Sequence, residues 1–148
     1  MTGPLRIFAI NLGSTSTKVA YYEDEQCIHR DTIDHDSADL RRFTSVFDQG
    51  DLRKEVVLAY LGTKGIELSQ LDAFVSRGGQ TQPIPGGVYR ITPEMVSQAE
   101  GGDFGVHVCS VGCRIALDLT RDVRAIPLTV DTPSTDEFQQ LARISGLK

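Results

Sequence analysis

The chain has 148 residues, of which 40% are hydrophobic and 24% are charged, and its formal net charge is −5. This is the balance of one globular domain, and it excludes broad binding to nucleic acid or to an anionic membrane surface because no block of Lys and Arg is present. No apolar run approaches the roughly 20 residues of a membrane span, and residues 1–4 are too short and uncharged to be expected to begin a secretory leader. The three cysteines are an odd number, which indicates free thiols in a reducing compartment, so we expect a cytoplasmic protein.

Three strands are predicted in the first third of the chain, at about residues 5–11, 17–23 and 26–33. The turns between them are much shorter than the dozen residues that a parallel connection needs. The three strands are therefore expected to form an antiparallel meander.

The turn between the first two strands is rich in hydrogen-bonding groups. It consists of one glycine and four hydroxyl residues, Gly13, Ser14, Thr15, Ser16 and Thr17. Asn11, the only asparagine of the chain, stands where the first strand ends. Such a tip can hold a phosphate, or it can be an ordinary hydroxyl-rich turn, and the turn alone leaves both interpretations open. It is not a P-loop, because a strand and not a helix follows Lys18.

Two helices without catalytic side chains are predicted next. The first is capped by Asp36 or Ser37, ends near Gln49 and carries apolar residues at helical spacing, namely Leu40, Phe43 and Phe47. The second begins at Asp51, ends at Gly62 and carries an apolar stripe of Leu52, Val56 and Tyr60. Both helices are expected to be scaffold.

A short apolar run, Asp72–Ser76, predicts a strand that is buried on both faces of the sheet. The loop after it begins with Arg77 and contains two glycine pairs and two prolines, which are Gly78, Gly79, Pro83, Pro85, Gly86 and Gly87. Glycines allow close backbone approach and prolines limit flexibility, so this loop is expected to form a binding surface.

The rest of the chain predicts helices around one more strand. Thr92 caps a helix that ends at Gly101–Gly102, and a second helix begins near Ser110 and buries Val111, Ile115 and Leu119. A strand at Ala125–Val130 precedes Asp131, and a last helix after Asp136 carries Phe138, Leu141 and Ile144. The order βββ-α-β-α-β-α predicts a mixed α/β sheet covered by helices on both faces.

This order and four motifs resemble the acetate and butyrate kinase family of the actin-like ATPase superfamily. The motifs span nearly the whole chain in the expected order, at residues 10–18, 74–79, 83–89 and 130–146. The resemblance implies an RNase H-like (actin-like ATPase) domain over residues 1–148, which corresponds to the amino-terminal half of a two-domain carboxylate kinase.

The resemblance also implies a reaction. Members of the family transfer a phosphoryl group between ATP and a short-chain fatty acid such as butyrate, form an acyl phosphate, and use ATP or ADP with Mg²⁺. The adenosine pocket belongs to the second domain, so the 148 residues alone are expected to be inactive. The chain is expected to be either the first domain of a longer protein or a natural half whose partner is another chain, and the sequence does not predict its oligomeric state.

Matching the motifs residue by residue implies three groups of site residues. The catalytic group is Arg77, Asp131 and His107; the phosphate-binding hairpin is Asn11, Gly13, Ser14, Thr15 and Ser16; the substrate loop is Gly78, Gly79, Gly86 and Gly87. From the residues alone, Arg77 suits a carboxylate or phosphoryl oxygen because its guanidinium presents paired donors, whereas Asp131 fits a metal-orienting carboxylate and a turn cap equally well.

Departures from the family motifs support a second interpretation. The family has Asn-Pro-Gly-Ser where this chain has Asn-Leu-Gly-Ser at 11–14, and the segments 107–113 and 131–137 also differ. The alternative is a non-catalytic actin-like interaction or regulatory module. His107, Cys109 and Cys113 could each bind zinc, but a structural zinc site needs four ligands, so no metal site formed by the protein alone is predicted.

Overall fold

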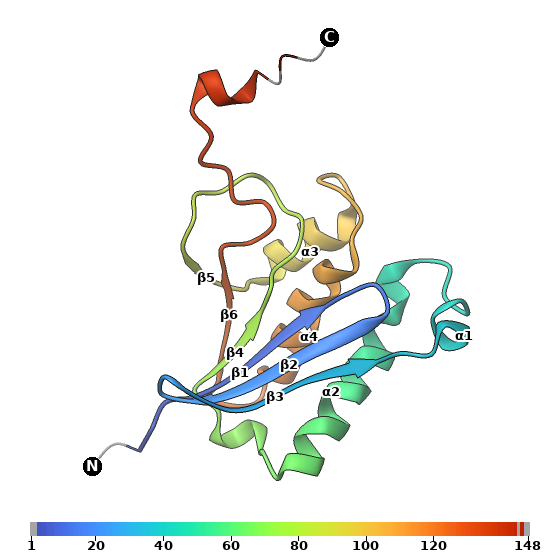
Figure 1. Cartoon of the computed structure of the whole chain (residues 1–148), viewed down its shortest axis with the longest axis vertical. Helices are drawn as coiled ribbons and strands as arrows, with labels where there is room; N and C mark the ends of the chain where they lie inside the picture. Colours follow the sequence, from blue (N-terminus) through green and yellow to red (C-terminus); the bar gives the residue numbers. More distant parts are fainter. Residues whose placement is uncertain (1–2, 145, 147–148) are drawn as a thin grey trace.

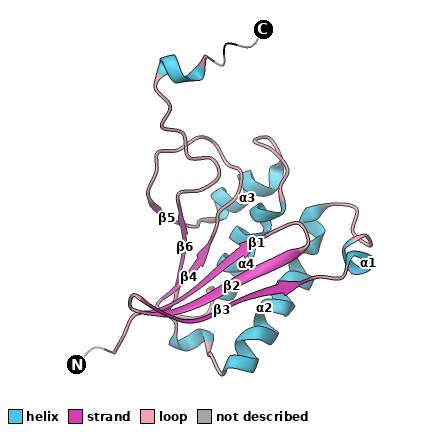
Figure 2. Cartoon of the chain, viewed as in Figure 1, coloured by secondary structure: helices cyan, strands magenta, loops and turns pink. Residues whose placement is uncertain are grey.

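The computed structural model describes residues 3–144 and 146. Within these residues, a six-stranded mixed sheet has the order β3-β2-β1-β4-β6-β5 (Figure 1). The strands are β1 (Arg6–Leu12), β2 (Ser16–Glu23), β3 (Gln26–Asp34), β4 (Ala73–Ser76), β5 (Val88–Arg90) and β6 (Ile126–Val130). The helices are α1 (Ser37–Leu40), η1 (Val46–Gln49), α2 (Gly50–Lys64), η2 (Leu68–Gln70), α3 (Pro93–Gly101), η3 (Val108–Ser110), α4 (Val111–Leu119) and η4 (Gln140–Arg143), as Figure 2 shows by colour.

The antiparallel meander is confirmed. β1 pairs with β2 from Arg6 opposite Glu23 to Leu12 opposite Thr17, and β2 pairs antiparallel with β3. β4 then lies parallel to β1, and β6 lies parallel to β4, because helical segments connect these strands over the face of the sheet. The predicted mixed α/β sheet with an antiparallel start is therefore confirmed.

The core fills one face of the sheet. Alternate residues of β1 and β2, including Phe8, Ile10 and Val19, are buried against the helices. Phe8 packs on Phe74 of β4 and on Tyr60 of α2, with ring centroids 5.4 and 6.1 Å apart. Figure 1 shows α2, α3 and α4 behind the sheet. In the described residues no helix covers the opposite face, so the prediction of helices on both faces is wrong.

Of the predicted stripe of α2, Tyr60 is buried as expected, whereas the rest of the buried face lies one residue later than predicted. Its buried residues include Arg53, Val57, Tyr60 and Leu61, whereas Leu52 and Val56 are only partly buried. An arginine therefore occupies a core position that the apolar spacing assigned to its neighbour. Because Arg53 is charged, hydrophobic spacing alone does not assign it to the core.

The predicted helix from Asp36 to Gln49 is wrong in length. Asp36 caps α1 as expected, with its carboxylate accepting from the amide of Ala38, but α1 ends after one turn. Ser45 then starts the separate helix η1 through a capping box with Asp48. Because the hydroxyl of Ser45 caps the start of η1, Ser45 lies outside the helix and the predicted continuous helix is interrupted there.

The other helix starts agree with the sequence. Thr92 accepts a hydrogen bond from the amide of Met95, Pro93 is the first residue of α3, and Gly102 ends it in the left-handed conformation. None of the helices within residues 3–144 and 146 has the length and apolar character that crossing a membrane requires.

The predicted carboxyl-terminal helix is wrong in extent. Only the short helix η4 forms, and this segment projects from the top of the molecule in Figure 1. Phe138, Leu141 and Ile144 are 68%, 80% and 71% exposed. Helical spacing alone does not hold a helix together when no described surface covers its apolar stripe.

Candidate functional site

The carboxyl ends of three parallel strands meet at one edge of the sheet. Asn11 lies near the end of β1, Arg77 follows β4, and Asp131 follows β6. Open α/β sheets bind ligands outside this edge, where loops leave the strands. The topology therefore brings together three residues that are separated by more than fifty positions in the sequence.

A cavity of about 270 Å³ lies at this edge. Its lining residues come from the end of β1, the start of the glycine loop, the segment before α4 and the turn after β6, and they are Asn11, Arg77, Gln80, His107, Cys109 and Pro133. Three of the residues predicted from the sequence thus share one cavity. Gln80 and Cys109 were not predicted as site residues.

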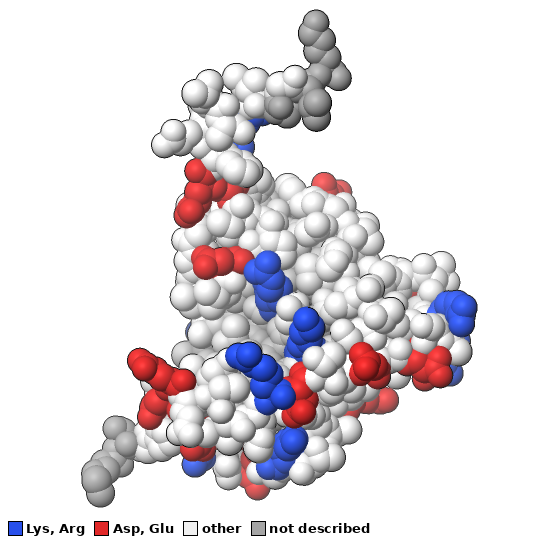
Figure 3. Space-filling view, viewed as in Figure 1, with Lys and Arg blue, Asp and Glu red and all other residues white. Residues whose placement is uncertain are grey.

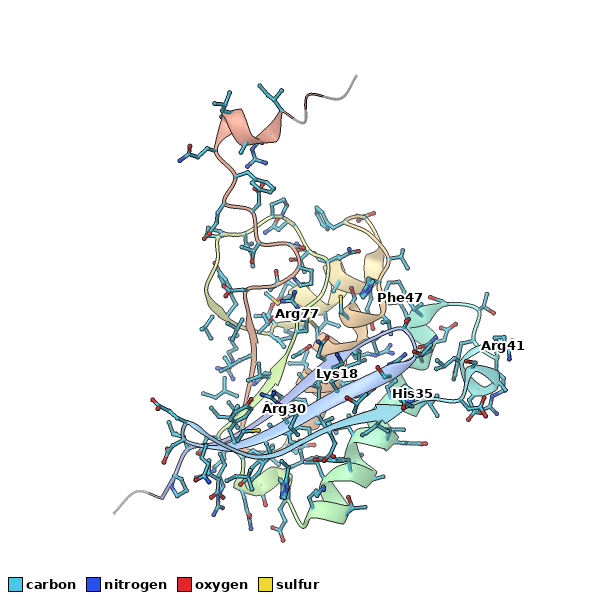
Figure 4. The ribbon with its side chains drawn as sticks, in the orientation of Figure 1. Lys18, Arg30, His35, Arg41, Phe47 and Arg77 are labelled. Atoms are coloured by element: carbon cyan, nitrogen blue, oxygen red, sulfur yellow. The ribbon has the colours of Figure 1, made fainter. Side chains whose placement is uncertain are left out.

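Arg77 is held loosely. Its backbone amide continues the ladder to the carbonyl of Ile10, and its side chain is exposed, with Nη1 donating to the backbone carbonyl of Asp131 at 3.1 Å. Figure 4 shows the side chain over the open face of the sheet near the end of β4. The guanidinium keeps several donors available for an anionic ligand.

His107 has a fixed tautomer. Its Nδ1 accepts a hydrogen bond from the backbone amide of Cys109 at 3.1 Å, which starts the short helix η3. A nitrogen that accepts from an amide carries no proton, so the neutral ring has its proton on Nε2. The ring is exposed and belongs to a residue that lines the cavity, so the Nε2–H is the donor that it can offer to a ligand.

Asp131 holds a loop in place. Its backbone lies in the left-handed region at φ 44°, which is uncommon for a residue with a side chain, and its Oδ1 accepts from the amide of Gly87 at 2.8 Å. Asp131 does not line the cavity of Asn11, Arg77 and His107, although its carbonyl contacts Arg77. The structure gives it the role of a cap, and a metal-orienting role stays a prediction.

The hairpin tip is closed by one main-chain hydrogen bond, from the amide of Gly13 to the carbonyl of Ser16 at 2.8 Å. Gly13 therefore uses its own amide within the turn. Ser14 and Thr15 are exposed, and Ser16 is partly buried. The outer surface of the tip presents these hydroxyl groups together with exposed Asn11.

The first glycine pair of the loop has a packing role. Gly78 has a φ of 88°, and a Cβ there would lie 2.5 Å from Oγ1 of Thr129. A Cβ on Gly79 would lie 2.6 Å from the Cβ of Ala99. Both glycines are buried, so packing explains them without a ligand, and their contact with substrate stays a prediction.

The second glycine pair is held by two carboxylates. The amide of Gly86 donates to Oε1 of Glu137 at 2.9 Å, and the amide of Gly87 donates to Asp131. These two amides are therefore occupied in this structure. The loop from Pro83 to Gly87 is ordered by the segment after β6.

Comparison with known proteins gives consistent relatives. Butyrate kinase 1 of Clostridium acetobutylicum is 36% identical to this chain over 142 residues, which are 96% of the chain. Probable butyrate kinases of two Clostridium botulinum strains, Eklund 17B and Alaska E43, are 34% identical over the same length. The resemblance to butyrate kinases is confirmed. The chain spans about 40% of the length of these relatives.

Two further comparisons add less. No family model matches the chain. The solved structure of a propionate kinase from Francisella tularensis aligns with 85% of this chain and 36% of its own, with 14% sequence identity and a TM-score of 0.46. The butyrate kinase relatives therefore carry the functional comparison.

One residue behind the hairpin was not predicted from the sequence. Arg53 of α2 is fully buried, and its guanidinium donates to the backbone carbonyls of Ser14 and Ser16. The signal that could have found it is its place in the series Gln49, Arg53, Val57 and Leu61, four residues apart on one helix face. A polar pair within a buried stripe indicates a buried polar contact.

The face of the sheet opposite the helices carries a second cavity, of about 600 Å³. Small and apolar residues of the central strands form its floor, and Lys18, Arg30 and Arg77 lie around it. Figure 4 shows these three side chains along the face, and Figure 3 shows Lys and Arg side chains gathered there. Lys18 is exposed on β2 and lies directly opposite Asn11 of β1, with which it lines this cavity.

The described residues contain no group of three or more His, Cys, Asp or Glu side chains placed to hold a metal ion. Burial raises the pKa of the Cys113 thiol to about 12 and also raises that of Cys109, so both remain thiols at neutral pH. Cys113 packs in the hydrophobic core.

Proposed function

We propose that residues 1–148 are the amino-terminal domain of a cytoplasmic carboxylate kinase that transfers a phosphoryl group between ATP and a short-chain, butyrate-like fatty acid. The observation that carries the proposal is the cavity lined by Asn11, Arg77 and His107, three residues from distant segments that the family motifs assign to the site. The butyrate kinase relatives support the same reaction class.

Phosphoryl transfer to a carboxylate does not require a strong general base. A carboxylate is already a nucleophile, so the protein has to position it and stabilise charge on the transferring group. Arg77 offers paired donors to a phosphoryl or carboxylate oxygen, and Nε2–H of His107 is a second donor in the same cavity. Asn11 offers its side-chain amide at the end of β1.

The hairpin is proposed to contact the phosphates of ATP or ADP. Its exposed hydroxyl groups, on Ser14 and Thr15, face solvent at the same sheet edge as Asn11. Gly86 and Gly87 are proposed to shape the acyl side of the site, since their loop is held against the segment after Asp131.

Mg²⁺ fits this donor set as a partner of the nucleotide. The ion binds chiefly through phosphates and water with one or two carboxylates, and Asp131 is a carboxylate at this edge whose Oδ1 is engaged by Gly87. Asp131 would hold the ion through water, and the ion would neutralise charge on the transferred group.

The site is proposed to be completed by a second domain. The chain matches about 40% of its relatives' length, and the adenosine pocket of the family lies outside the motifs found here. The isolated 148 residues are therefore expected to bind parts of the substrates without turning over ATP and butyrate.

The test is formation of acyl hydroxamate from ATP, butyrate and hydroxylamine. A protein that carries this chain together with the remaining length of its relatives should form it, and the 148 residues alone should not. Hydroxamate from the isolated chain would contradict the two-domain proposal. A lack of product from the long protein would favour the non-catalytic interaction or regulatory module.

A further inference from the structure

The guanidinium of Arg53 is buried among neutral acceptors directly behind the hairpin tip. Arg53 has 0% exposure and is the largest fully buried side chain among the described residues. Nε and Nη2 donate to Oε1 of Gln49 at 3.1 and 3.0 Å, and Nη1 donates to Oγ1 of Thr17 at 3.3 Å. The two remaining bonds reach the carbonyls of Ser16, at 3.2 Å, and Ser14, at 3.0 Å.

None of these acceptors is a carboxylate. Burial lowers the pKa of Arg53 to about 10, with no opposing contribution from an acid, so the side chain remains a cation at neutral pH. A buried charge without a counter-ion is costly, and folded proteins normally pair such charges. The energetic cost indicates that the charge serves something besides packing.

The bond to Ser14 also fixes the direction of an amide. In a planar trans peptide the C=O and the following N–H point in opposite directions. Because the carbonyl of Ser14 points back to Arg53, the amide of Thr15 points away from it. No described residue accepts from this amide, and Thr15 itself is exposed.

The carbonyl group of Thr15 is held in place as well. Its carbonyl accepts from the backbone amide of His35 at the end of β3, at 2.9 Å. Gln49, which holds the guanidinium from the other side, follows the capping box of Ser45 and Asp48. The hairpin tip is thus held from β3 and from the start of α2 at once.

We propose that Arg53 is a positioning residue for anion binding at the hairpin tip: it aims the Thr15 amide outward and supplies a fixed positive charge that a bound phosphate group neutralises. Arg53 does not touch the ligand, because the tip lies between them. The inference rests on the proposed function only in taking a phosphate group as the ligand.

The test is a titration of the isotope-labelled 148-residue chain with inorganic pyrophosphate. The NMR shifts of the backbone amide resonances report the binding. Pyrophosphate should shift the Thr15 amide most strongly among the hairpin amides. Arg53→Gln, which removes the charge and most donors, should weaken this binding about tenfold. Arg53→Lys, which keeps the charge but loses the planar fork, should fall between Arg53→Gln and the parent chain.

Arg121→Gln is the matched control. It removes the same charge from an exposed side chain that pairs only with Asp118 among the described residues, so its pyrophosphate affinity should stay within about twofold of the parent. An Arg53→Gln affinity equal to that of Arg121→Gln, with the rest of the spectrum unchanged, would overturn the inference.

If the Arg53 variants do not fold, the amide shifts of the parent chain with pyrophosphate still test whether the hairpin tip binds the anion. Shifts confined to residues around Arg77 and His107, with Ser14–Ser16 unmoved, would overturn the role of the tip and leave the proposed kinase activity standing. Conversely, failure of the long protein to make hydroxamate leaves the pyrophosphate result unaffected, so the two proposals fail separately.

Discussion

Arg53 and Arg77 lie in two regions near the same end of the sheet and have opposite environments. Arg53 is fully buried behind the hairpin and makes five hydrogen bonds to neutral acceptors. Arg77 is exposed after β4 and makes one bond, to the carbonyl of Asp131. The donors of the first guanidinium are taken by two backbone carbonyls and by the side chains of Gln49 and Thr17, whereas the second guanidinium keeps donors for a ligand. The same side chain therefore shapes the site in one region and faces it in the other.

The largest effect on stability is expected in the buried region. Arg53→Ala should lower the free energy of unfolding by about 2–4 kcal/mol, because it leaves the carbonyls of Ser14 and Ser16 without their donor and opens a cavity. Urea unfolding of the 148-residue chain measures this loss. Arg121→Ala, an exposed control, should change it by no more than about 0.5 kcal/mol, and a similar small change for Arg53→Ala would remove the contrast between the two regions.

The exposed region should show the reverse pattern. In the long protein, Arg77→Ala should reduce kcat/KM at least about 10²-fold, as expected for losing a donor to the transferring group, and should hardly change stability. Steady-state kinetics with ATP and butyrate measure the first effect, and thermal unfolding measures the second. A nearly unchanged kcat/KM would remove Arg77 from the site.

The strand end that carries Arg77 depends on a glycine. Gly78→Ala should destabilise the chain by about 1–3 kcal/mol, because its φ is 88° and the new Cβ would meet Thr129. Gly62→Ala is the matched control, since it lies in α2 with nothing within 4 Å of a Cβ and should be neutral or stabilising by up to about 1 kcal/mol. Equal changes in the free energy of unfolding for the two variants would show that the left-handed backbone and the close contact at Gly78 do not restrict the residue at this position.

The smallest effect concerns His35, which touches the Arg53 region. Burial and the charge of Arg53 lower the pKa of His35 below 6.5, and its Nε2 lies 2.8 Å from Oγ1 of Thr17, which accepts from Arg53. His35 therefore binds a proton more readily in the unfolded chain than in the folded chain. The stability that neutral His35 contributes is complete above pH 6.5 and declines as the pH falls toward and through the folded pKa. Urea midpoints at pH 7.5 and 5.5 should therefore converge slightly in His35→Gln, and an identical pH difference in both proteins would contradict this.

Much of the local structure follows from the sequence. The meander is predicted by its short turns, and Asp36, Thr92 and Pro93 mark helix starts correctly because a cap involves neighbours in the chain. The predictions failed where a distant surface decides. The helix at Asp36 ends after one turn, and the stripe of Phe138, Leu141 and Ile144 forms only η4 because no described surface covers it.

The predictions for the candidate site were also only partly supported. Motif resemblance selects Asn11, Arg77 and His107, and the structure places them around one cavity. The same motifs suggest catalysis for Asp131 and substrate contact for Gly78, yet in the structure the first caps a loop and the second fits a tight packing position. A motif identifies a position without saying which of its neighbours the residue will touch.

The sequence by itself determined the antiparallel start, the hydroxyl-rich tip between β1 and β2 and the strand endings that carry Asn11 and Arg77, because turn length and alternation act within a few residues. Only the tertiary structure decided that α2 turns Arg53 and not Leu52 into the core, and that its guanidinium reaches the tip almost forty residues earlier in the chain. Hydrophobic spacing cannot assign a buried cation, since its position depends on acceptors that only folding brings within reach.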